Sequence, residues 1–279
     1  MSVFRAIFRH TSGRIGGIIV GLYLVIAFFG MLGLTPHDAL MQYRVDRLQP
    51  PSWVFWMGTD LFGRDVASRL MKGIGQSFVV SFLSVSLATF AGTVLGLTAA
   101  WFGKRWDGLI MRLMDILLAF PAILLALLII TVIGPGIWTS VAAIAIVYTP
   151  IFTRVVRGPA LSLKAREFVD AARTFGSSTR YILTRHLLLN LVGPLTVQVT
   201  LALAWALLTE ASLSFLGLGT QPPASSLGLM LSDSRNLMET APWLLIFPGL
   251  TIMIGILGFN LLGDALRDIL DPKTRRAVA

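Results

Sequence analysis

The sequence predicts an all-α membrane protein with six membrane-spanning helices. The chain has 279 residues, 55% of them hydrophobic and only 13% charged, and its mean hydropathy is +0.78. Soluble domains carry about a quarter charged residues, so this composition is typical of proteins that cross the bilayer several times. Apolar runs of about 17–25 residues, long enough to span a bilayer, recur along the chain. They lie at 15–34, 78–102, 113–133, 137–154, 187–212 and 242–263.

The first apolar run follows three arginines and must be distinguished from a signal peptide. At about 20 residues it is longer than a typical signal-peptide core. No A-x-A-like cleavage site follows it, so we expect an uncleaved first helix.

The third and fourth runs are separated only by the "IGPG" stretch at 133–136. Two glycines and a proline predict a tight turn, and the two runs therefore form a predicted membrane hairpin. The fourth run is interrupted by Tyr148, Thr149 and Pro150.

The distribution of basic residues predicts the orientation of the chain. If the amino terminus lies inside the cell, the segments on that side hold 17 of the 23 Lys and Arg residues, and those on the other side hold 6. Cytoplasmic loops carry the excess of Lys and Arg, so both termini are expected in the cytoplasm. The excess of basic residues on the cytoplasmic side also explains the net charge of +9, so no nucleic-acid partner is needed to account for it.

The predicted spans and loops divide the chain into three parts. We predict an amino-terminal part with the first helix and an outer loop, a core of five membrane helices with one inside loop and one outer loop, and a short cytoplasmic tail. The amino-terminal part is 1–77, with its outer loop at 35–77. The core is 78–272, with the inside loop at 155–186 and the second outer loop at 213–241. The tail is 273–279.

The inside loop contains an amphipathic pattern. Phe168, Ala171, Ala172 and Phe175 recur at helical spacing and predict one apolar stripe. Gly176 stands where a glycine commonly ends a helix.

Ser177 or Ser178 then predicts the start of a second short helix. The apolar face of the first helix allows two interpretations, a helix that docks in a groove of another protein and a helix that lies on lipid headgroups. Two alanines in the stripe let a partner's backbone approach closely, which favours docking.

Several motifs together resemble one family of transport proteins. "D-A-A-x3-G" at 170–176 is similar to the cytoplasmic EAA loop of ABC importer permeases, with Asp170 where the motif has glutamate. Further blocks look like the dipeptide, oligopeptide and nickel type of permease and occur in the order of that family: "GTDLFGRDVASRLMKG" (58–73), "MDILLAFPAILLAL" (114–127), "REFVDAARTFGSSTRYILTRHLLLN" (166–190), "EASLSFLGLGTQPP" (210–223) and "NLLGDALRDILDP" (260–272). Leu189 departs from the family, which usually has proline there.

The resemblance implies a type I ABC importer fold and a subunit that does no chemistry itself. The loop helix would sit in a cleft of a cytoplasmic ATPase, and the residues expected there are Glu167, Phe168, Asp170, Ala171, Ala172, Phe175 and Gly176. Glu167 and Asp170 are expected to meet basic groups of that ATPase. The chain lacks a G-x-x-x-x-G-K-[ST] phosphate loop, so ATP and magnesium would be bound by partner subunits.

The same resemblance implies the partners and the location. We expect a second, commonly non-identical permease subunit that completes the pore, two ATPases, a solute-binding protein outside, and the lipid of the bacterial inner membrane. The solute is not encoded in any motif of this chain; di- or oligopeptide is the expectation from the breadth of the family.

Three residues near the end of the fifth run are candidates for the pore or its outer gate: Glu210, Ser214 and Phe215. An ionisable group at membrane depth is a functional candidate by default. The alternative is a carboxylate at the membrane interface that the following loop covers, and its position favours this alternative.

Two other charged features have structural interpretations. We expect Asp115 to pair with Arg112 or to favour a helix amino terminus. The "GTDLFGRD" stretch predicts a turn in which Arg64 pairs locally. The three histidines are scattered and indicate no metal cluster, and His186 is expected to be structural.

Two other classes of function compete with the permease. An ion-gradient-driven secondary transporter usually needs intramembrane carboxylates or paired repeats of broken helices, and only Glu210 qualifies. An intramembrane protease is disfavoured because Gly75, Gln76 and Ser77 lack the glycine that would follow, and no H-E-x-x-H motif occurs.

Overall fold

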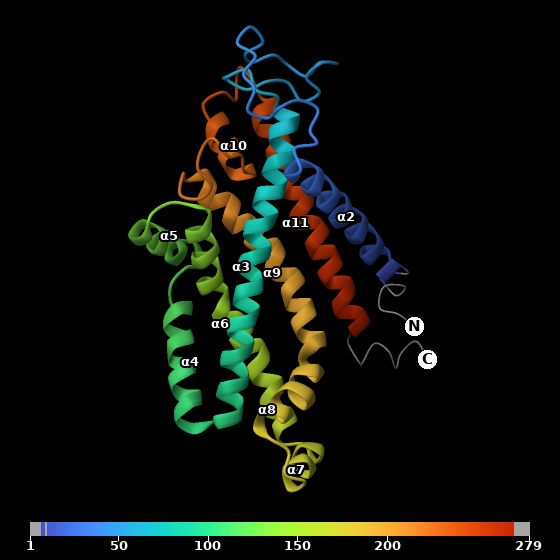
Figure 1. Ribbon diagram of the computed structural model, residues 1–279, viewed down its shortest axis with the longest axis vertical. Helices are drawn as coiled ribbons and strands as arrows, with labels where there is room; N and C mark the ends of the chain where they lie inside the picture. Colours follow the sequence, from blue (N-terminus) through green and yellow to red (C-terminus); the bar gives the residue numbers. More distant parts are fainter. Residues whose placement is uncertain (1–6, 9, 271–279) are drawn as a thin grey trace.

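The computed structural model describes residues 7–8 and 10–270, and this part of the chain is helical without a β-strand (Figure 1). Five helices are long and apolar enough to cross a membrane, and a bent pair gives a sixth candidate. The continuous spans are α2 (Thr11–Met31), α3 (Val66–Phe102), α6 (Ile137–Lys164), the rod Thr179–Phe215, and α11 (Trp243–Leu270). The rod comprises α8 (Thr179–Tyr181), the π-helix η1 (Ile182–Leu188) and α9 (Leu189–Phe215).

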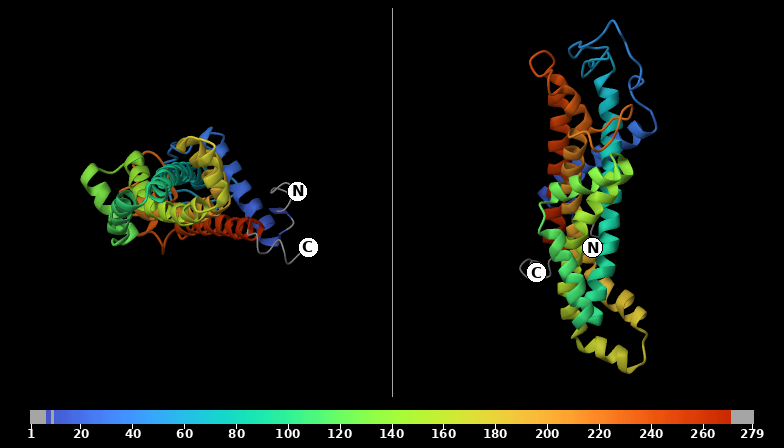
Figure 2. Two further views of the ribbon diagram at one scale, coloured as in Figure 1. Left: turned by 90° about the horizontal axis from the view of Figure 1, so that it is seen from below. Right: turned by 90° about the vertical axis from the view of Figure 1, so that its left-hand side faces the viewer.

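The spans form an elongated bundle with a short helix near each end. The helix α7 (Glu167–Thr174) lies at one extreme of the long axis, and α10 (Leu227–Ser234) lies towards the other, beneath the loop that joins α2 to α3 (Figures 1 and 2). We call these the α7 end and the α10 end. The α7 end gathers the loop that the charge distribution assigns to the cytoplasm.

The predicted third span at 113–133 is wrong as a single helix. The chain instead forms α4 (Lys104–Leu118) and α5 (Ala122–Ile133), which meet at an angle of 92°. Pro121 lacks an amide hydrogen and disfavours helical backbone at Phe120, so the helix stops before it and restarts after it. The predicted turn at 133–136 is confirmed, with positive φ at Gly134 and Gly136.

The helix α3 begins at Val66, so the part of the predicted outer loop at 66–77 is helical. Asp65 causes this early start because its carboxylate accepts a hydrogen bond from the amide of Ser68 at 2.9 Å and caps the helix. The outer loop therefore ends at Asp65, and Arg69 and Lys72 lie within α3.

The helices α3 and α6 pack closely in the centre of the bundle. A Cβ atom added at Gly96 of α3 would lie 2.7 Å from the carbonyl oxygen of Thr153, so only glycine allows this approach. Pro150 and Pro159 lie inside α6 without ending it, and the helix continues to Lys164. The predicted inside loop at 155–186 is thus wrong in its first part and begins only after α6.

The helices α2 and α11 lie side by side along one flank of the bundle, opposite α4 and α5 (Figures 1 and 2). His10 Nε2, just before α2, lies 3.6 Å from Asp268 Oδ2 near the end of α11. The start of the first span and the end of the last one therefore share one side. The predicted tail at 273–279 lies outside the described residues.

Candidate functional site

The helix α7 projects beyond the spans and is held by one buried side chain. Val169 has an exposed fraction of 0% and packs in an apolar cluster with Leu97, Ile182, Leu187 and Leu191. These partners come from α3, η1 and α9. Val169 therefore fixes which face of α7 points into the protein.

The opposite face of α7 exposes apolar side chains. Phe175 has an exposed fraction of 89%, Phe168 and Ala171 are also exposed, and Ala172 is half-buried against the Val169 cluster. The predicted stripe is thus divided, because Ala172 lies beside the inward face. An exposed aromatic residue beside exposed small residues is a surface suited to a protein partner.

The acidic residues of α7 are also exposed. Glu167 and Asp170 lie in the first turn, where a negative charge is favourable at a helix amino terminus. Asp170 Oδ1 lies 3.6 Å from Arg173 Nη1 one turn later, with both side chains largely in solvent. Both carboxylates are therefore accessible from outside the protein.

A cation–aromatic contact ties α7 to the end of α3. The guanidinium carbon of Arg173 lies 4.5 Å from the centre of the Trp101 ring. Lys164, at the end of α6, donates hydrogen bonds to the carbonyl oxygens of Ala100 at 3.0 Å and of Trp101 at 2.6 Å. The last turn of α3 is therefore held by α6 and contacts α7.

The sharp bend after α7 follows the sequence. Gly176 has a φ of +77°, which L side chains adopt only with strain, and its amide donates to the carbonyl oxygen of Arg173 at 2.9 Å. Ser178 then caps the next helix by accepting a hydrogen bond from the amide of Tyr181 at 3.3 Å. The predicted two-helix arrangement is confirmed.

His186 has the structural position expected from the sequence. Its ring lies 6.0 Å from that of Phe168 and 5.5 Å from that of Tyr181, between centroids. These tilted and edge-on ring contacts link α7 to α8 and η1. The backbone runs without a break through Leu189, where the family usually has proline, and the π-helix η1 lies immediately before it.

Glu210 is buried inside the protein near the end of α9. Its exposed fraction is 1%, and its Oε1 accepts a hydrogen bond from Ser214 Oγ at 2.7 Å. The following loop does close over it, because the amide of Thr220 donates to Ser214 Oγ at 3.2 Å. Phe215, the third candidate, is exposed at the end of α9. This places the three candidates; their role in a pore stays a prediction.

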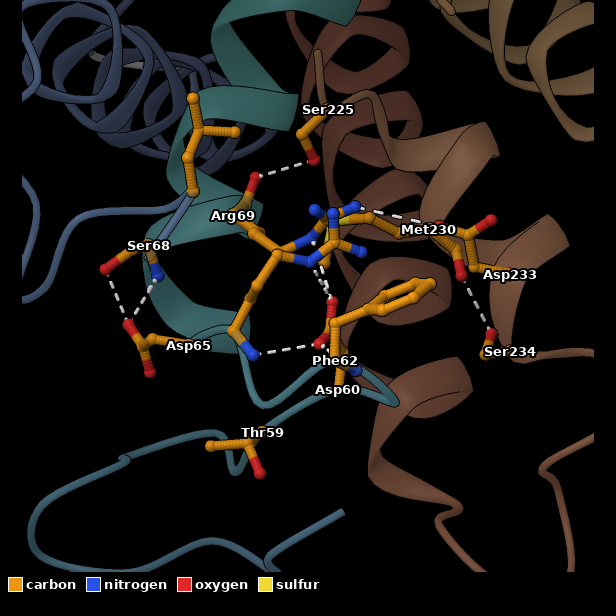
Figure 3. Close-up of polar contacts among 12 residues, drawn as sticks. Thr59, Asp60, Phe62, Asp65, Ser68, Arg69, Ser225, Met230, Asp233 and Ser234 are labelled. Carbon is orange, nitrogen blue, oxygen red and sulfur yellow. Dashed lines mark hydrogen bonds and ion pairs between the residues drawn. The ribbon is translucent and has the colours of Figure 1, made fainter. Parts of the chain in front are cut away.

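A network of charges lies near the α10 end (Figure 3). Asp60 accepts a hydrogen bond from Arg64 Nε at 2.7 Å, which confirms the local pairing predicted for Arg64. Arg69 of α3 lies between Asp60 on the loop and Asp233 of α10. Partial burial raises the pKa of Asp233 above its ordinary value, although the positive charges of Arg69 and Arg64 oppose this shift.

Asp115 does not pair with Arg112. Its Oδ1 accepts a hydrogen bond from Arg154 Nη2 of α6 at 2.6 Å, and α4 begins eleven residues earlier, at Lys104. The predicted role at a helix amino terminus is therefore wrong as well. The pair joins α4 to α6 across an exposed surface.

Sequence reasoning missed three features: the anchor Val169, the contact of Trp101 with Arg173, and the burial of Arg69. Val169 carried a signal, since a β-branched apolar residue lay beside the predicted stripe. The Trp101–Arg173 contact and the burial of Arg69 depend on contacts between segments far apart in the chain, so no local sequence pattern predicts them.

The chain is similar over most of its length to membrane components of transport systems. Residues 92–276 match the family described as binding-protein-dependent transport system inner membrane component. A dipeptide transport system permease protein from Alkalihalophilus pseudofirmus is 44% identical, over 98% of this chain and 89% of the relative. A di/tripeptide transport system permease protein from Pseudomonas aeruginosa is 41% identical, over 97% of this chain and 91% of the relative.

Another relative and two solved structures extend the comparison. A glutathione transport system permease protein from Pectobacterium atrosepticum is 41% identical, over 98% of this chain and 90% of the relative. The MetNI methionine ABC transporter in an inward-facing conformation matches with a TM-score of 0.54 and 17% identity, over 70% of this chain and 95% of the other. An amino acid ABC transporter matches with a TM-score of 0.51 and 16% identity, over 72% of this chain and 90% of the other. These two similarities concern the fold.

Proposed function

This chain belongs to the family of binding-protein-dependent transport system inner membrane components and is a permease subunit of an ABC importer. From this premise we propose that it carries di- or oligopeptides and couples to an ATPase through α7. The relatives named for dipeptide, di/tripeptide and glutathione transport support a peptide-like solute. The ion-gradient-driven alternative gains no support from the similar proteins.

One observation carries the coupling role: α7 is anchored on one face and exposes an apolar surface on the other. Val169 and Ala172 face the protein, while Phe168, Ala171 and Phe175 are exposed at the extreme of the bundle. These three apolar side chains lie close together on one short helix and its end, so they form a surface that a partner can cover. A groove on a partner subunit can bury this surface.

The anchoring side of α7 gives a path for transmitting motion. The Val169 cluster reaches η1 and α9, and Arg173 reaches Trp101 at the end of α3. Lys164 joins that same turn of α3 to α6. A displacement of α7 by a partner would therefore act on three spans at once.

The rest of the assembly follows from the family and is part of the proposal. A second permease subunit completes the pore, a binding protein delivers the solute from outside, and two cytoplasmic ATPases bind ATP and magnesium. The difference in free energy between their ATP-bound and ADP-bound states drives the two conformations of the pore.

Replacement of Phe175 by alanine tests the coupling surface. The side chain is almost fully exposed, so the fold should be unaffected, whereas docking should lose a large apolar contact. We expect Phe175→Ala to reduce ATP-dependent peptide uptake in proteoliposomes by about tenfold or more, the equivalent of about 1.4 kcal/mol of docking free energy. Co-purification of the ATPases should fall in parallel.

Phe102→Ala is the matched control, because Phe102 is an exposed aromatic residue at the end of α3 and lies off α7. It should leave uptake and ATPase association unchanged. A second variant, Gly176→Leu, forces a left-handed backbone on a branched residue at a strain of about 1–2 kcal/mol and should abolish uptake without preventing membrane insertion. Equal uptake in Phe175→Ala, Phe102→Ala and the parent protein would refute the coupling role.

A further inference from the structure

The guanidinium group of Arg69 is buried without adequate partners. Its side chain has an exposed fraction of 4%, and Nη1 has no hydrogen-bond partner among the described residues. Nε lies 3.6 Å from Asp60 Oδ2 and Nη2 lies 3.7 Å from Asp233 Oδ2, both beyond ordinary hydrogen-bond length. A buried cation normally has its donors satisfied, so Arg69 retains unused binding capacity.

The neighbouring charges do not use up this capacity. Asp60 is already satisfied, since it accepts hydrogen bonds from the amides of Phe62 and Arg64 and from Arg64 Nε. Arg64 is engaged in turn by Asp60 and by the ring of Phe62, whose centre lies 4.7 Å from the guanidinium carbon. Asp233 is half-exposed, and its Oδ2 lies 3.7 Å from Arg69 Nη2, too far for an ordinary hydrogen bond.

A cleft lies beside the charged residues that are drawn in Figure 3. It has a volume of about 180 Å³ and is lined by the four charged residues together with apolar side chains, including Leu61, Phe62, Met230, Leu237 and Leu244. We call it the Arg69 cleft. One water molecule needs about 10–15 Å³ of such space, so the cleft is large enough for a small solute.

We propose that the Arg69 cleft binds the carboxylate of a small apolar solute. Guanidinium matches carboxylate in a planar, bidentate geometry, and the free Nη1 supplies a donor that neither aspartate occupies. The apolar wall accepts the body of the ligand. Asp233 competes for the same guanidinium and sets the affinity. This site lies at the α10 end and does not depend on the coupling role of α7.

A matched pair of probes tests the site. N-acetyl-leucine and N-acetyl-leucine amide differ only in the carboxylate, and each is titrated by saturation-transfer NMR against the purified transport complex in lipid nanodiscs without binding protein. We expect saturable binding of the acid and binding of the amide at least about tenfold weaker, the equivalent of about 1.4 kcal/mol. Equal binding of both probes, or no saturable binding of the acid, would overturn the proposal.

Three variants assign the binding to Arg69. Arg69→Gln should weaken acid binding by about tenfold or more, whereas Arg235→Gln, an exposed arginine just after α10, should leave it unchanged. Asp233→Asn removes the competitor and should tighten binding by about threefold or more. If Arg69→Gln does not fold, Asp233→Asn still tests the site, because removing a purely structural ion pair would not raise the affinity for the acid. Unchanged or weaker binding of the acid to Asp233→Asn refutes the site.

Discussion

The charged side chains of α7 lie largely in solvent, whereas at the α10 end a guanidinium group is buried beside two aspartates. Asp170, Arg173, Asp115 and Arg154 are all more than a third exposed, and their ion pairs are local or join helix surfaces. Arg69, in contrast, is almost fully enclosed. The two ends therefore differ in what their charges can do.

The difference has a physical reason. Exposed ion pairs contribute little to stability, so the α7 end can exchange its charge partners for those of another chain at low cost. A buried cation has already lost its hydration and needs a partner within the protein or a ligand. The α7 end thus suits a docking surface, while the α10 end suits a preformed site.

Replacement of Val169 by aspartate should break the α7 end and gives the largest expected effect. A carboxylate in the apolar cluster costs at least about 3 kcal/mol, so α7 should detach from η1 and α9. We expect rapid hydrogen exchange of the α7 amides and uptake at background level. Arg166→Asp, at the exposed N-cap position of the same helix where a carboxylate is favourable, is the control and should leave the α7 amides protected. Protected α7 amides in Val169→Asp would mean that Val169 is not the anchor.

Replacement of Asp65 by alanine tests the α10 end. Asp65 is buried and caps α3, so its loss should lower the free energy of unfolding by about 1–2 kcal/mol, measured by thermal denaturation in detergent. Asp115→Ala removes an exposed pair between α4 and α6 and should cost about 0.5 kcal/mol or less. Equal losses in the two variants would contradict the contrast between buried and exposed charges.

Replacement of Arg173 by methionine should have the smallest effect and sharpens the description of the α7 end. It keeps the length of the side chain but removes a cation–aromatic contact of about 0.5–1 kcal/mol at Trp101. We expect peptide uptake per ATP hydrolysed to fall severalfold while the ATPases stay bound. Arg180→Met, an exposed position of α8, is the comparison and should leave that ratio unchanged. Loss of ATPase binding in Arg173→Met would instead place Arg173 in the docking surface.

Much of this architecture follows from the sequence. Hydropathy located five of the six spans, the glycines and proline at 133–136 predicted the hairpin turn, and Gly176 and Ser178 predicted the bend after α7. These features depend on local backbone preferences and on the transfer of apolar side chains out of water, and both can be read from a short window of residues. The motifs from 58 to 272 likewise indicated the family that the comparisons show.

The tertiary structure alone decided which faces are covered and which charges meet. The stripe on α7 predicted Ala172 as part of the exposed face, but packing against Val169 and its cluster turns Ala172 inward. Asp115 meets Arg154, 39 positions further along the chain, and not Arg112. Arg69 is buried only because α10 and the outer loop close around it. Such contacts join segments that are distant in sequence, so their energies depend on how the helices pack and not on any local pattern.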